Sequence, residues 1–133
     1  MERNILFVNC TGTLSSSLEA VKKEDFRVET AYDSDAAIQR LERREYDVII
    51  LKVPPLAESW QFCRDVRHIT KTPLIVISNN ASTEVCVKAI NAGADFFLRK
   101  YTGPQELIAR IRALIYRSNL EKQRQTRQAI PTS

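Results

Sequence analysis

The chain has 133 residues, a formal net charge of +4 and a charged fraction of 27%, which fits one domain of ordinary soluble composition. No apolar run is long enough to cross a bilayer or to form the core of a signal peptide. Three scattered cysteines, Cys10, Cys63 and Cys86, lack metal-ligand spacing, so we expect a reduced, cytoplasmic protein without a disulfide framework.

Apolar and amphipathic segments alternate along the chain. In order, the patterns predict a strand at 5–8, a helix at 13–23, a strand at 26–31, a helix at 34–44 and a strand at 47–53. They then predict a helix at 59–68, a strand at 73–78, a helix at 82–91, a strand at 95–99 and a helix that begins at Pro104. This alternation predicts a parallel, doubly wound α/β sheet with helices on both faces, a three-layer domain.

The positive charge lies near the C-terminus. That segment has +3 of the total +4 and contains Arg117, Lys122, Arg124 and Arg127 against Glu121. A basic end of this kind is a solvated helix end or linker, or else a contact for nucleic acid or anionic lipid. No aromatic residue follows Tyr116 to stack on bases, which favours the linker. We expect disorder from about residue 128.

Several stretches carry a resemblance to a known family. They are DVIILKVPP, TPLIVIS and, most specifically, NAGADFFLRKYTGPQELIARIRALIYR at residues 91–117. The chain resembles the response-regulator receiver (CheY-like) family over roughly residues 3–117, and its arginine-rich end is most similar to the OmpR-like group. The resemblance implies a flavodoxin-like (βα)5 fold with strand order 2-1-3-4-5. It also implies a receiver-like domain at 1–117 and a helical extension and linker at 118–133, leading to an output domain outside this chain.

Receivers of this family hold Mg²⁺ with two acids after the first strand and phosphorylate an aspartate that ends the third strand. A hydroxyl after the fourth strand and a lysine after the fifth bind the phosphoryl group. The matching positions here are Asn9, Cys10, Lys52, Ser78 and Lys100. Only the last two keep the family's chemistry, so the resemblance implies a degenerate phosphoacceptor pocket, with no metal, no cofactor and no catalytic turnover.

Lys52 and Cys10 each leave alternatives open. Lys52 either extends its ammonium from the strand end into water, or it pairs with an acid such as Glu58, or it mimics an occupied site or binds an anion together with Lys100. Cys10 is either a small buried apolar group or a redox sensor in the positive field of Lys52.

The loop after the first strand also allows a different class of function. Cys10-Thr11-Gly12-Thr13 partly resembles the phosphate loop of flavodoxins, which share this strand order and bind FMN at the same edge. Trp60 follows the third strand, where an aromatic ring could cover a flavin. A flavin- or nucleotide-binding protein is therefore the alternative of the enzyme-like class.

The resemblance also implies an interaction surface. OmpR-like receivers dimerise through the fourth helix, fifth strand and fifth helix, and the matching residues here are Asp95, Phe96, Glu106, Arg110 and Arg117. We expect this face to bind a protein partner or a second copy without a phosphorylation trigger. The function implied is a module of signal transduction and transcription regulation that reaches DNA only through an absent output domain and has no membrane contact. A standalone adaptor is the alternative.

Overall fold

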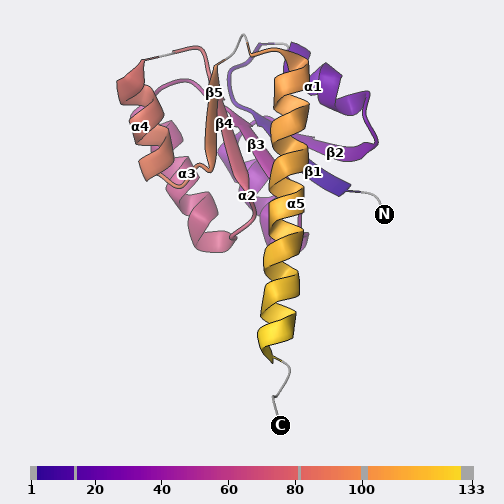
Figure 1. The fold of residues 1–133 in the computed structure, drawn as a ribbon. Coiled ribbons are helices and arrows are strands. Elements are labelled where there is room, and N and C mark those ends of the chain that lie inside the picture. The colour runs from indigo at the N-terminus through magenta and orange to yellow at the C-terminus, as the bar shows by residue number, and fades with distance from the viewer. Residues whose placement is uncertain (1–2, 14, 81, 100–101, 130–133) are drawn as a thin grey trace.

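The computed structural model describes residues 3–13, 15–80, 82–99 and 102–129, with side chains up to residue 124. Five strands alternate with five helices (Figure 1). The first half contains β1 (Arg3–Asn9), α1 (Ser16–Lys22), β2 (Phe26–Ala31), α2 (Ser34–Arg43) and β3 (Val48–Lys52). The second half contains α3 (Ala57–Ile69), β4 (Leu74–Ser78), α4 (Thr83–Asn91), β5 (Phe96–Arg99) and α5 (Pro104–Ala129).

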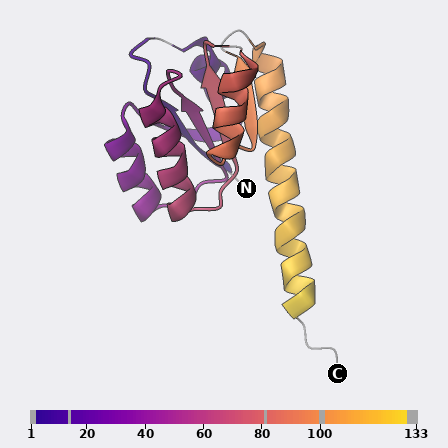
Figure 2. The same cartoon turned by 90° about the vertical axis from the view of Figure 1, so that its left-hand side faces the viewer.

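The strands form one parallel sheet of order β2-β1-β3-β4-β5, which confirms the expected fold class. Helices α1 and α5 cover one face of this sheet, and α2, α3 and α4 cover the other (Figures 1 and 2). Alternate residues of the central strands enter the two cores. Leu6 and Leu51 belong to the α2–α4 side, whereas Phe7 and Ile50 belong to the α1–α5 side. The near-continuous apolar runs of the sequence thus reflect strands buried on both faces.

Most predicted boundaries lie within two residues of the observed ones, and the start of α1 is the main error. The helix begins at Ser16 rather than at residue 13, and Ser15 is its N-cap, with Oγ accepting from Leu18 N at 3.2 Å. Ser82 caps α4 in the same way, since Ser82 Oγ accepts from Val85 N at 3.2 Å. A side-chain oxygen satisfies an otherwise unpaired amide in both helices.

Helix α5 extends far beyond the sheet. It has 26 residues, a length of about 39 Å, and its last turns protrude below the domain (Figures 1 and 2). Disorder was expected from about residue 128; α5 is described to Ala129, and residues 130–133 lie outside the described part of the chain. Among the described residues, no helix is both long and apolar enough to cross a membrane.

Candidate functional site

The carboxyl ends of the central strands bring the predicted pocket residues to one edge of the sheet. Asn9 ends β1, Lys52 ends β3 and Ser78 ends β4. Asn9 pairs with Lys52 in the register of β1 and β3, and Lys52 pairs with Ile77 in that of β3 and β4. In an open parallel sheet this edge is where ligands bind. Lys100 lies outside the described residues.

Asn9 closes the loop between β1 and α1. Its Nδ2 donates to the carbonyl of Thr13 at 2.8 Å, and its Oδ1 accepts from the Thr11 backbone N at 3.2 Å and from Thr11 Oγ1 at 2.7 Å. The Thr11 and Thr13 hydroxyls lie 2.9 Å apart. A carboxylate at position 9 would lack the donor that binds the Thr13 carbonyl. The amide therefore has a structural role that the acid of a metal site could not fill.

Lys52 is buried, with 3% of its surface exposed. Its Nζ lies 3.4 Å from Thr13 Oγ1. The expectation that the ammonium extends into water is therefore wrong, because the β1–α1 loop covers it. A buried cation at the end of β3 raises the electrostatic cost of placing Mg²⁺ beside it.

Ser78 and Cys10 complete the described part of the pocket. Ser78 is buried, and its Oγ accepts from Asn80 N at 3.4 Å. Burial, and to a smaller extent the Asp33 carboxylate, raises the pKa of the Cys10 thiol. A thiol with a raised pKa is protonated and unreactive at neutral pH, which supports the interpretation of Cys10 as a small apolar group.

The chemistry of this edge is unlike that of a magnesium-dependent phosphoacceptor. The described residues contain no cluster of three or more His, Cys, Asp or Glu side chains that could hold a metal ion. Asn9, Cys10 and Lys52 supply an amide, a thiol and an amine, and none of these is the carboxylate that Mg²⁺ coordination and acyl phosphate formation require.

Trp60 is buried in the hydrophobic core. The indole is 6% exposed and belongs to the core cluster on the α2–α4 side of the sheet. It is therefore unavailable to cover a flavin. The aromatic side chain on which the flavin alternative rested has a packing role instead.

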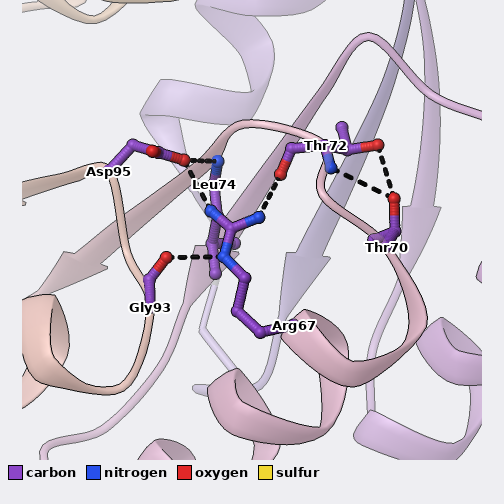
Figure 3. Close-up of polar contacts among 6 residues, drawn as sticks. All are labelled: Arg67, Thr70, Thr72, Leu74, Gly93 and Asp95. Atoms are coloured by element: carbon purple, nitrogen blue, oxygen red, sulfur yellow. Dashed lines mark hydrogen bonds and ion pairs between the residues drawn. The ribbon is translucent and has the colours of Figure 1, made fainter.

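Asp95, expected at a dimer interface, is bound within its own chain. The Arg67 guanidinium donates to Asp95 Oδ2 at 2.5 Å, to the Gly93 carbonyl at 2.6 Å and to the Thr72 carbonyl at 2.5 Å (Figure 3). Asp95 Oδ2 also accepts from Leu74 N at 2.7 Å. This clamp joins the end of α3 to the amino ends of β4 and β5. No motif in the sequence singles out Arg67, and its position in the last turn of α3 is its only signal.

The other residues of the expected interaction face also contact one another. Glu106 and Arg110 form an ion pair at 3.8 Å. Phe96 is half-buried against the α1–α5 core. The guanidiniums of Arg110 and Arg117 lie 4.8 and 5.8 Å from its ring centroid. The face therefore presents guanidinium groups over a partly covered aromatic ring.

Comparisons with known proteins agree with this fold. The family described as the response regulator receiver domain matches residues 11–112. The response regulator ArlR of Staphylococcus aureus is 33% identical over 115 residues, which cover 85% of this chain and 52% of ArlR. The chain thus spans about half the length of the curated relatives it matches.

Solved structures show the same fold at lower identity. A two-component response regulator from Clostridium difficile has a TM-score of 0.78 at 22% identity, with 89% of this chain and 99% of that one covered. A CheY-like receiver domain protein from Methanospirillum hungatei has a TM-score of 0.79 at 22% identity, with 91% and 99% covered.

Proposed function

This chain belongs to the response regulator receiver family, and from that premise we propose that it is a receiver whose signalling does not depend on an aspartyl phosphate. The observation that carries the proposal is the buried ammonium of Lys52 at the end of β3. An amine cannot form the acyl phosphate that a receiver aspartate forms, and a buried cation opposes the Mg²⁺ that the reaction requires.

The neighbouring positions support the same proposal. Asn9 uses both its donor and its acceptor to close the β1–α1 loop, and the Cys10 thiol has a raised pKa. The Asn9 amide oxygen is therefore already used within the loop, and a thiol and an amine are poor Mg²⁺ ligands. A fixed loop of this kind suits a domain that binds its partner constitutively.

Action through protein contacts is the second part of the proposal. A receiver without phosphoryl chemistry transmits a signal only by binding, to a second copy or to another protein. The face of α4, β5 and α5 is the proposed surface, and any contact with DNA belongs to an output domain. A winged-helix segment encoded after Ser133 would support the transcriptional regulator, whereas its absence from the gene would support the standalone adaptor.

Phosphate analogues and donors test the proposal directly. The full chain is incubated with Mg²⁺ and acetyl phosphate, and its intact mass is measured; beryllofluoride is titrated in parallel and followed by amide NMR. We expect no phosphate adduct and no Mg²⁺-dependent chemical-shift change at the ends of β1 and β3. An adduct mapped to this edge would refute the proposal.

A further inference from the structure

A cleft at the carboxyl edge of the sheet lies beside the predicted phosphoacceptor pocket. It is lined by the β1–α1 loop, by α1 and by Tyr32, which directly follows β2, and its volume is about 690 Å³. Of the described pocket residues only Asn9 lines it, so the cleft is a different site from the end of β3 at Lys52. A volume of this size accommodates a small organic molecule. We call this site the β1–α1 cleft.

Two of the lining side chains are buried and have donor hydrogens that the described chain does not use. Ser15 is 6% exposed; its Oγ accepts from Leu18 N, and its own hydroxyl hydrogen goes to no described residue. Asn9 is also 6% exposed, and its Nδ2, which has two hydrogens, donates only to the Thr13 carbonyl within the described chain. Buried donors are normally satisfied, by the protein or by a bound molecule. The pair therefore indicates that the cleft receives a hydrogen-bond acceptor.

The remainder of the cleft suits an apolar ring. Apolar atoms make up most of its lining surface. Leu18 supplies an aliphatic wall from α1, and Tyr32 exposes 65% of its surface. An exposed tyrosine ring offers a face on which another aromatic ring can stack, with a gain beyond that of the buried area. An aromatic ligand would therefore use this part of the cleft.

The charges around the cleft cancel. Glu19 and Lys22 line it and form an ion pair at 4.0 Å. Nearby, the buried Lys52 ammonium contacts Thr13 Oγ1, and Asp33 caps α2 through Oδ1. Two ammonium groups and two carboxylates leave no net charge to attract a phosphate or a carboxylate. This balance favours an uncharged ligand over a nucleotide.

We infer that the β1–α1 cleft binds an uncharged aromatic small molecule that carries a carbonyl or a similar acceptor. The acceptor would bind Ser15 Oγ and Asn9 Nδ2, and the ring would pack against Leu18 and Tyr32. The inference goes beyond the proposed function and does not depend on it, because Lys52 does not line the cleft. A ligand held by Asn9 would favour the closed β1–α1 loop, and binding would thus give the domain an input other than phosphate.

Three naphthalene dyes are the probes. Prodan, a propionyl derivative of dimethylaminonaphthalene, is uncharged and has a ketone as its acceptor. The parent dimethylaminonaphthalene lacks the ketone, and anilinonaphthalene sulfonate adds a negative charge. The fluorescence of each dye changes when the dye leaves water, so titration with the full chain measures each dissociation constant. Amide NMR with Prodan identifies the residues whose signals shift.

Two variants alter the cleft, and each has a matched control. Tyr32→Ala removes the aromatic ring, and Tyr116→Ala removes a tyrosine of similar exposure, 67%, from α5. Ser16→Phe places a bulky ring at the first residue of α1, which lines the cleft, and Thr83→Phe does so at the first residue of α4. All four positions are exposed, so folding is expected to survive, and thermal denaturation without dye checks it.

We expect saturable binding of Prodan, with an affinity at least about fivefold higher than that of either other dye. Tyr32→Ala should lower the affinity for Prodan about fivefold and Ser16→Phe about tenfold or more, whereas each control should change it less than about twofold. The NMR shifts should include the amides of Asn9, Ser15 and Leu18.

Three results would overturn the inference. The first is the absence of saturable Prodan binding, which would mean that water alone occupies the cleft. The second is equal or tighter binding of the sulfonate or of the dye without the ketone. The third is Prodan binding that neither cleft variant weakens. A phosphate adduct would instead refute only the proposed function.

Discussion

Asn9 and Lys52 lie opposite each other in the register of β1 and β3, and both side chains reach Thr13. The Asn9 amide donates to its carbonyl at 2.8 Å, and the Lys52 ammonium lies 3.4 Å from its hydroxyl. These two contacts fasten the β1–α1 loop over the end of the sheet. The Asn9 and Lys52 side chains therefore have a structural role in this protein.

Loss of the Asn9 side chain should destabilise the fold. Asn9→Ala removes a donor and an acceptor from a residue that is only 6% exposed, and the freed loop groups can recover part of their hydrogen bonds from water. We expect the free energy of unfolding to fall by about 1–3 kcal/mol. Urea denaturation measures this free energy of unfolding. Asn91→Ala at the exposed end of α4 is the control, and it should change the free energy by less than about 0.5 kcal/mol.

Restoring the acceptor carboxylate alone should not restore phosphorylation. In Lys52→Asp the chain still has an amide at position 9 and a thiol at position 10, so the metal lacks the carboxylate ligands it requires. We expect no Mg²⁺-dependent beryllofluoride response in this variant. The triple variant, which also carries Asn9→Asp and Cys10→Asp, should gain one, as measured by amide NMR. A full response in the single variant would show that the neighbouring residues do not limit the chemistry.

The sequence predicted the fold better than it predicted the site. Strand spans and helix starts follow from local patterns, which is why the strand predicted at 26–31 and the helix start predicted at Pro104 agree with the structure. The exposure of Lys52 depends on how the β1–α1 loop closes over it. The availability of Asp95 depends on Arg67, which is 28 positions away. Both contacts join segments that are far apart in the sequence. Periodic patterns describe only local structure, so they could not reveal either contact.

Gly93 and Arg67 should be energetically coupled. Gly93 has φ of +117°, and a Cβ at this position would lie 2.3 Å from Arg67 Cγ. Gly93→Ala therefore incurs both backbone strain and a clash, and we expect a loss of about 2–4 kcal/mol in the free energy of unfolding. The Arg67→Ala variant removes the clash along with the clamp. In that background the cost of Gly93→Ala should fall by about 1 kcal/mol or more.

A double-mutant cycle by urea denaturation measures this coupling. Gly103→Ala is the matched control, because a Cβ there meets no atom within 4 Å, and its effect should stay within about 0.5 kcal/mol. Strict additivity of Arg67→Ala and Gly93→Ala would mean that the arginine side chain simply moves aside. The clamp of Figure 3 would then be less rigid than its hydrogen bonds indicate.

Tyr46 should make the protein sensitive to alkaline pH. Its hydroxyl donates to Glu29, which also pairs with Arg40 at 3.5 Å and with Arg44. Burial, followed by the hydrogen bond to Glu29 and the charge of that carboxylate, raises the pKa of Tyr46 from 10.0 to about 12. The folded state therefore keeps a proton that the unfolded chain releases above pH 10. This contribution to stability is complete below pH 10 and is lost as the pH rises toward 12.

Comparison with Tyr46→Phe isolates this effect. At pH 8 the variant lacks the hydrogen bond to Glu29, and its free energy of unfolding should be about 1–2 kcal/mol lower than that of the wild type. Between pH 10 and 11 this gap in the free energy of unfolding between the wild type and the variant should narrow, by at most about 1.4 kcal/mol per pH unit. Burial also raises the pKa of the Cys63 thiol, to about 11, but this titration is common to both proteins and cancels in the difference. Urea denaturation at pH 8, 10 and 11 measures the gap, and a gap that stays constant would show that Tyr46 keeps its ordinary pKa.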